Sequence, residues 1–120
     1  MDEKITIAQL KESVKHFCEE RDWDQYHNAK DLAIGIITES SELLEHFRFK
    51  SEEDVNEFLN INSNKEEISE EISDILFFIL RFAQKYQIDI SNKFYQKLDK
   101  NSLNYPIDKT KGLNKKYTEL

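Results

Sequence analysis

Residues that interrupt helices are scarce in this sequence: only two glycines and one proline occur among 120 residues. Gly and Pro are the least favourable residues in a helix interior, so long helices can run here without a break. Valine is also rare, whereas Glu, Lys, Leu and Ile abound. This composition predicts an all-α fold, and the length predicts a single domain, residues 1–120, with room for a hydrophobic core.

The spacing of the apolar residues predicts four main helices. A capping box formed by Thr6 and Gln9 marks the start of the first helix, and a second one, Ser63 with Glu66, is expected at the start of the third. The fourth helix should stop before Pro106, because the residue that precedes a proline disfavours helical geometry. The predicted helices cover about residues 6–20, 30–47, 64–87 and 90–104.

The remaining segments are expected to be connections and a tail. We predict a helical turn and a polar loop within residues 51–64, and a basic, irregular tail over about residues 106–120. Gly35 lies inside the second predicted helix, where the missing side chain often lets another backbone or a ligand approach closely. Together, the four helices predict a subunit of the four-helix-bundle type.

Two pairs of carboxylates, Glu39-x-x-Glu42 and Glu71-x-x-Asp74, lie within apolar stretches of the second and third predicted helices. Residues three apart share a helix face, so each pair aims two carboxylates in the same direction. Burying ionised carboxylates is costly unless positive charge compensates, and no run of Lys or Arg lies nearby. A divalent cation would compensate, and Mg²⁺ prefers such hard oxygen ligands.

A structural ion-pair network is the alternative to a metal site, since an acidic chain also carries such pairs on solvated helix faces. Asp74 favours the metal site. Its neighbours Ile72 and Ile75 place it next to the predicted core, and Asp is a poor residue in a helix interior. We therefore expect Asp74 to be buried and to have a role that compensates for the cost of an Asp at this position.

Charge and targeting signals limit the class of partner. The formal net charge of −7 argues against a protein that coats nucleic acid, because such proteins usually carry a basic face. Cys18 is the single cysteine, which excludes an internal disulfide and predicts a small buried hydrophobe. No signal-peptide pattern is present and the longest apolar run is too short to span a bilayer, so we expect a cytoplasmic protein without a membrane partner.

Two further features predict contacts with other molecules. The third predicted helix is apolar almost all round from Ile72 to Phe82, which predicts that a second subunit covers part of it. Trp23 and Tyr26 lie in the polar connection after the first helix, where they either seal the end of the bundle or form a stacking surface for a base. No Gly-rich phosphate loop occurs, so phosphate binding would depend on metal ions and on Lys, Arg or Asn side chains.

Several motifs, taken together, resemble one family. The Glu-x-x-Glu pair, 28 intervening residues and the Glu-x-x-Asp pair are similar to the signature of the all-α nucleoside triphosphate pyrophosphohydrolases, the MazG-like family. Other segments resemble the dCTP pyrophosphatase branch, and the match keeps the same order over nearly the whole chain. These segments are Phe17-x-x-Glu20-Arg21-Asp22-Trp23-x-Gln25-Tyr26-His27 with Lys30-x-Leu32, Lys97-Leu98-x-x-Asn101 with Tyr105-Pro106, and Lys116-Tyr117-Thr118-Glu119-Leu120.

The resemblance implies a homo-oligomer, either a dimer or a tetramer, that uses Mg²⁺. Matched by position, the metal ligands would be Glu39, Glu42, Glu71 and Asp74. Glu70, beside Glu71, would orient or deprotonate the attacking water, which makes Glu70 and Glu71 the catalytic candidates.

The same positional match implies a set of substrate contacts. The substrate-binding candidates are Trp23, His27, Phe49, Lys50, Lys97 and Asn101. This sequence departs from the branch at two positions: Phe49 stands where a second tryptophan is found, and Phe78 where a tyrosine is common. Both departures leave the metal ligands intact and concern the preference for a base.

The function that the resemblance implies is Mg²⁺-dependent hydrolysis of a (deoxy)nucleoside triphosphate, dCTP or a modified dNTP, to the monophosphate and pyrophosphate. A related enzyme for another nucleotide, such as dUTP or phosphoribosyl-ATP, is one alternative. A catalytically silent helical module that binds nucleotide or a protein is the other. The expected partners are the nucleoside triphosphate and further copies of the chain, with no nucleic-acid polymer.

Overall fold

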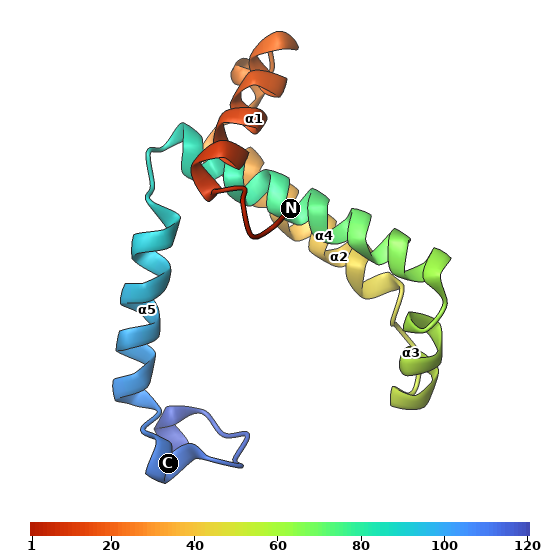
Figure 1. The fold of residues 1–120 in the computed structure, drawn as a ribbon, viewed down its shortest axis with the longest axis vertical. Helices are drawn as coiled ribbons and strands as arrows, with labels where there is room; N and C mark the ends of the chain where they lie inside the picture. Colours follow the sequence, from red (N-terminus) through yellow and green to blue (C-terminus); the bar gives the residue numbers. More distant parts are fainter. The chain divides into compact units, whose positions relative to one another are not determined.

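Every regular element of the structure, a computed structural model that describes residues 1–120, is helical (Figure 1). The all-α prediction is confirmed. The chain divides into two compact units, Met1–Ile88 and Asp89–Leu120. The first unit contains helices α1 (Ile7–Glu20), α2 (Ala29–Glu45), α3 (Glu52–Leu59) and α4 (Asn62–Lys85), and the second contains α5 (Ile90–Asn104) and α6 (Ile107–Thr110).

Local sequence signals explain how α1 and α3 begin. The predicted capping box of α1 is present: Thr6 Oγ1 accepts a hydrogen bond from the Gln9 backbone at 3.1 Å, and Gln9 Oε1 accepts one from the Thr6 backbone at 2.7 Å. Ser51 caps α3 by accepting from the Asp54 backbone at 3.1 Å. A complete helix of eight residues therefore stands where only a helical turn and a loop were expected.

The predicted cap of the third long helix is wrong. Helix α4 begins at Asn62 with Ile61 at the N-cap, so Ser63 lies inside the helix. The physical reason is the neighbouring helix: α3 continues to Leu59 and leaves only a tight corner before α4. The Asn64 side-chain amide stabilises this corner by donating to the Phe58 carbonyl at 3.1 Å.

Helix α4 is the element on which α1, α2 and α3 all pack. Helices α2 and α4 run antiparallel side by side (Figure 1), since Gly35 lies against Phe78 while His46, further along α2, lies against the earlier residue Glu71. A Cβ atom on Gly35 would lie 2.6 Å from the Phe78 ring. The predicted close approach at Gly35 is thus real, and an aromatic ring makes it.

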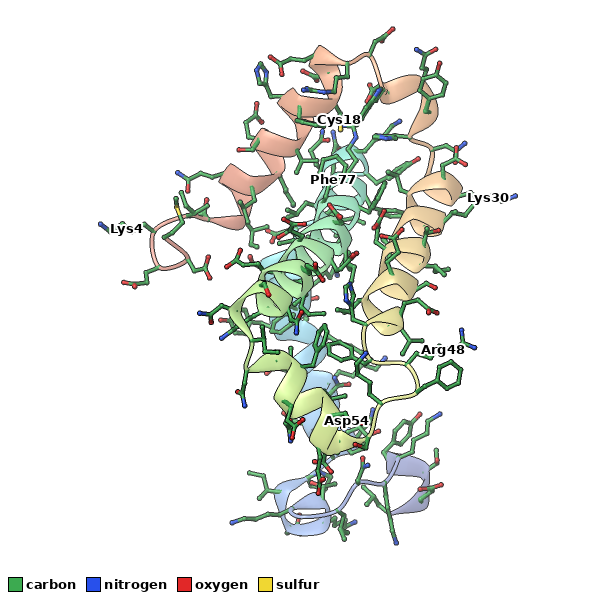
Figure 2. The ribbon with its side chains drawn as sticks, turned by 90° about the vertical axis from the view of Figure 1, so that its right-hand side faces the viewer. Lys4, Cys18, Lys30, Arg48, Asp54 and Phe77 are labelled. Carbon is green, nitrogen blue, oxygen red and sulfur yellow. The ribbon has the colours of Figure 1, made fainter.

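The buried core of the first unit is small. Its apolar members come from α1, α2 and α4, and they include Cys18, which is buried and free as predicted. Figure 2 shows Cys18 and Phe77 in the region where α1 approaches α4, and the rings of Phe17 and Phe77 meet edge to face at 5.8 Å. The buried apolar residues are Val14, Cys18, Leu32, Ile68, Leu80 and Ala83.

Much of the apolar surface remains exposed in a single chain. On α4, Ile72, Leu76 and Ile79 are exposed, and on α2 so are Ile34 and Ile37. Of the four long helices predicted for the bundle, α1, α2 and α4 lie in this first unit and α5 lies in the second. A second subunit that covers these faces stays a prediction.

The second unit consists of α5 and a short folded tail. Asp89 caps α5 by accepting from the Asn92 backbone at 3.0 Å, and the helix ends at Asn104 as predicted. The tail is more ordered than expected: it contains α6 and a 3₁₀ turn, Tyr117–Glu119, and the rings of Tyr105 and Tyr117 meet at 5.8 Å. This aromatic contact helps to explain why the tail is folded, because it packs the end of the chain against the end of α5. No helix in the chain combines the length and hydrophobicity needed to cross a bilayer.

Candidate metal centre and nucleotide site

Three carboxylates converge where the second half of α2 faces the first half of α4. Glu39 and Glu42 come from α2, and Glu71 comes from α4. One oxygen of each lies within 4.8 Å of the corresponding oxygens of the other two. The antiparallel packing of α2 and α4 thus brings the first predicted pair next to Glu71 of the second, although 28 residues lie between the two pairs in the sequence.

Burial and the neighbouring carboxylates both raise the pKa of Glu39. Burial raises the pKa of Glu39 above its ordinary value, and a hydrogen bond from its carboxyl group to Glu42 raises it further. The negative charges of Glu42, Asp74 and Glu71 act in the same direction. Because like charges disfavour ionisation, this cluster is a place where a cation would be bound strongly.

Glu71 shows the clearest need for a cation. Its Oε1 atom lies 3.5 Å from His46 Nε2, at the end of α2. Its Oε2 atom is buried and has no hydrogen-bond partner. A buried carboxylate oxygen without a partner costs free energy, so the residues present fit a divalent cation with oxygen ligands.

Asp74 and Glu70 lie differently from the three clustered residues. Asp74 is exposed, as is Glu42, so the expectation that these carboxylates are buried is wrong for a single chain. The reason is that part of the α4 surface has no helix packed on it, which leaves Ile72 exposed as well. Glu70 is also exposed, and the structure does not bring it into the cluster, because adjacent residues point about 100° apart around a helix.

Trp23 stands at the end of α1, in a turn rather than in a free loop. A 3₁₀ turn, Asp24–Tyr26, follows it. The indole meets the Phe17 ring edge to face at 5.6 Å and the His27 ring at 6.0 Å, and 37% of Trp23 remains exposed. The structure therefore places both Trp23 and His27 in one folded turn, with indole surface left for a ligand.

Arg81 is a residue of this region that sequence reasoning missed. It lies near the end of α4 with only 1% of its surface exposed. Its Nε atom donates to His27 Nδ1 at 3.0 Å, and its two terminal nitrogens bind the side chains of Gln84, at 2.6 Å, and Asp24. A charged residue directly after an apolar run is the sequence signal that could have indicated it.

Phe49 and Lys50 follow α2 at its other end. Phe49 has a left-handed backbone with φ of +64° and is 93% exposed. The Lys50 ammonium donates to the His46 carbonyl at 2.7 Å and lies 5.0 Å from the centre of the Phe58 ring. The structure therefore leaves Phe49 free to meet another molecule and ties Lys50 to its own chain.

Trp23 and Phe49 do not flank one pocket within a single chain. Trp23 precedes α2 and Phe49 follows it, and a helix of 17 residues is about 25 Å long. In Figure 2, Lys30, at the start of α2, and Arg48, beyond its end, lie at opposite ends of the helix. Two walls of one base pocket at these positions would require two chains.

Lys97 and Asn101 lie on α5, in the second unit. They are four residues apart and so share one helix face. Lys97 borders a hollow on the surface of α5 together with Lys93, Gln96 and Lys100, and Asn101 is half-buried. This face carries the positive charge that a phosphate contact needs, and the substrate contacts assigned to Lys97 and Asn101 stay predictions.

Comparisons with known proteins give the family. A model described as the MazG-like family matches residues 34–120, which include all four carboxylates. The chain is 30% identical to dCTP pyrophosphatase 1 of Bos taurus over 115 residues, covering 96% of this chain and 68% of that protein. The protein of the same name from Homo sapiens is 28% identical, and the match covers the same 96% of this chain and 68% of that protein.

A solved structure agrees with the sequence comparisons. A pyrophosphatase from Archaeoglobus fulgidus superposes with a TM-score of 0.77 at 33% identity, over 83% of this chain and 92% of that one. The chain belongs to the MazG-like family.

Proposed function

We propose that this chain is a Mg²⁺-dependent nucleoside triphosphate pyrophosphohydrolase that cleaves dCTP or a modified dNTP. One observation carries the proposal: Glu71 Oε2 is buried without a partner inside a cluster of carboxylates from two helices. A site made of carboxylates can bind a negatively charged triphosphate only if cations lie between them. The carboxylates of this cluster would be the ligands of those cations. The relatives named dCTP pyrophosphatase 1 support the nucleotide.

The positions of the clustered side chains support the proposed roles. Glu39, Glu42 and Glu71 would hold the metal from two sides, and Asp74 would complete the set one helical turn after Glu71. Magnesium, when bound, would neutralise triphosphate charge and make a bound water more acidic. His46 holds one oxygen of Glu71 in place, so that the other remains directed into the cluster.

The reaction requires little covalent work from the protein. A water molecule adds to the α-phosphorus, and the bond to the β-phosphate oxygen breaks, which gives the nucleoside monophosphate and pyrophosphate. We assign Glu70 to orient the water or accept its proton, and the exposed position of Glu70 leaves it open to solvent and substrate. Positioning and electrostatics supply the rest of the rate enhancement.

The proposal is tested by measuring pyrophosphate release from a panel of dNTPs and NTPs, with and without Mg²⁺. We expect metal-dependent release, with dCTP or a 5-substituted dCTP among the best substrates. Glu42→Gln should abolish it, whereas Glu45→Gln, one turn further along α2 and paired only with Arg48, should not. Equal activity of the two variants would contradict the assignment of the cluster.

The same panel separates the alternative functions. A strong preference for dUTP or an unrelated nucleotide would identify a different enzyme of the family. Binding of nucleotide without release of pyrophosphate, under any metal, would identify a catalytically silent module. Calorimetry with a non-hydrolysable dCTP analogue distinguishes this silent module from a chain that does not bind nucleotide.

A further inference from the structure

Arg81 is the one charged side chain that the chain buries. Its three donor nitrogens reach three different groups: the carboxylate of Asp24, the imidazole of His27 and the amide oxygen of Gln84. Two of these partners belong to the turn after α1, and the third belongs to α4 itself. The guanidinium group therefore joins the turn to α4.

Lys85 strengthens the same connection one turn later on α4. Its ammonium donates to the backbone carbonyls of Asp24, at 2.8 Å, and His27. Within the turn, backbone bonds run only from Tyr26 to Trp23 at 2.9 Å and from His27 to Asp24 at 3.2 Å. Cationic side chains of α4 thus fix the turn to α4, while the Trp23 backbone amide ties it to α1 by donating to the Cys18 carbonyl at 3.0 Å.

Stability alone does not account for a buried arginine at this position. Burying a guanidinium group has a desolvation cost that an apolar side chain of similar size avoids, and its acidic partner, the Asp24 side chain, is 64% exposed. What arginine adds is geometry, because its planar group directs several donors at fixed angles. The turn that it fixes carries Trp23, whose indole lies against His27.

We propose that Arg81 is a positioning residue for Trp23 and sets the orientation of the indole that walls the base pocket. The orientation is a property of the protein alone, whereas the consequence for the base depends on the proposed function. Arg81 itself touches no substrate in this assignment. It acts through Asp24 and His27, which lie on either side of the turn's centre.

The protonation state of His27 agrees with this role. Burial lowers the pKa of His27, and the positive charges of Arg81 and Lys85 on α4 lower it further. Asp24, in the turn, and Asp31, in α2, act in the opposite direction but are weaker. A neutral imidazole can accept the hydrogen bond from Arg81 at Nδ1, and a protonated one cannot.

Trp23 is the only tryptophan in the sequence, so intrinsic fluorescence reports its surroundings directly. We expect Arg81→Met to shift the emission to longer wavelength and to increase quenching by acrylamide, with the helical circular dichroism retained. Arg81→Lys should give a smaller change, because it keeps the positive charge but loses the planar group with its several donors. Arg48→Met is the matched control: it removes an exposed arginine beyond the other end of α2 and should leave the emission unchanged.

A second variant covers the case in which Arg81→Met does not fold. Asp24 is exposed, so Asp24→Ala releases one side of the turn without opening the core. It should shift the emission in the same direction as Arg81→Met. Unchanged emission and quenching in a folded Arg81→Met, or in Asp24→Ala if the first does not fold, would overturn the proposal.

Kinetics test the consequence for the nucleotide. Arg81→Met should raise KM for the best dNTP roughly tenfold, about the size of one lost stacking contact, and should leave kcat nearly unchanged. In a Trp23→Ala background the same substitution should add little, because residues that act through one another are not additive. Fully additive effects would show that Arg81 does not act through Trp23.

Failure of the proposed function would look different. In that case the wild-type chain would release no pyrophosphate from any nucleotide, while the fluorescence comparison would still decide whether Arg81 positions Trp23.

Discussion

The imidazole of His46 lies 3.5 Å from one carboxylate oxygen of Glu71, and the second oxygen of Glu71 is buried without a partner. His46 stands at the end of α2 and Glu71 in the first half of α4, so this contact joins the two helices at the carboxylate cluster. One oxygen of Glu71 thus has a partner in the protein, and the other has none. This arrangement is typical of a metal ligand supported by an outer partner.

The first prediction concerns the metal ligands. Glu42→Gln and Asp74→Asn should each reduce Mg²⁺-dependent hydrolysis by more than about 100-fold, since each removes a charged oxygen ligand. Without metal, Glu42→Gln should melt at a higher temperature than the wild type, because it removes repulsion that raises the pKa of Glu39. Thermal denaturation with and without Mg²⁺ measures both effects. Near-normal turnover of either variant would indicate that the carboxylates form a structural network and not a metal site.

His46→Ala gives a graded version of the same test. It should weaken Mg²⁺ binding by about 10-fold to 100-fold, the range seen when an outer-sphere partner is lost, while leaving all four carboxylates in place. A titration of Mg²⁺ against activity would show a larger apparent Kd at unchanged fold. An unchanged Kd would mean that His46 does not orient Glu71.

A prediction on pH follows from His27. The unfolded chain binds a proton at His27 near its ordinary pKa of 6.5, whereas the lowered pKa delays protonation in the folded chain. The unfolded state therefore binds more protons in this window, and the free energy of unfolding should fall as the pH drops below 6.5. His27→Asn, which keeps an acceptor for Arg81, should remove this part of the loss. Urea denaturation at about pH 7.5 and about pH 5.5 compares the two proteins, and identical pH dependence would contradict the assignment.

Gly35→Ala should destabilise the fold even though alanine is the better helix residue. The new Cβ atom would lie 2.6 Å from the ring of Phe78, so α2 and α4 would have to separate or the ring would have to move. Overpacking of this kind costs about 1–3 kcal/mol, which exceeds the roughly 1 kcal/mol gained from helix propensity. Adding Phe78→Leu should recover part of the loss in denaturation measurements. A stabilised single variant would contradict the tight contact.

Assembly is the subject of the next prediction. Exposed apolar residues occur along α2 and α4, including Ile37 and Ile72, and patches of this kind mark interfaces. We expect sedimentation velocity to show a dimer or a tetramer at micromolar concentration. Ile37→Glu should lower the assembly state, whereas Ile107→Glu, an exposed position on α6, should not. A stable wild-type monomer would contradict this prediction.

The base preference can be tested at Phe49. The phenylalanine ring is smaller than the tryptophan of the dCTP pyrophosphatase branch and lacks an N–H donor, so we expect moderate discrimination among bases. Phe49→Trp should sharpen the preference for dCTP by roughly 10-fold, the size of a modest packing difference. Steady-state kinetics on dCTP, dUTP and 5-substituted dCTP measure it. An unchanged ranking would place Phe49 outside the base pocket.

Local features of this protein could be read from the sequence because they depend on neighbouring residues. The capping box of Thr6 and Gln9 fixes the start of α1 without help from the rest of the fold. The spacing of Glu39 and Glu42 places both on one face of α2 in any context. Where a neighbouring helix intervened, local reading failed: α3 was longer than expected, and α4 began at Asn62 rather than at about residue 64, with Ile61 instead of Ser63 at its N-cap.

By itself, therefore, the sequence determined the helices and the acidic residues that each of them carries. Only the tertiary structure decided that α2 and α4 pack antiparallel. This packing places a carboxylate oxygen of Glu71 within 4.8 Å of carboxylate oxygens of Glu39 and Glu42. The tertiary structure also decided that Arg81 is buried against Asp24 and His27. Helix formation depends on interactions over three or four residues, whereas these contacts depend on which apolar faces pack together across long stretches of the chain.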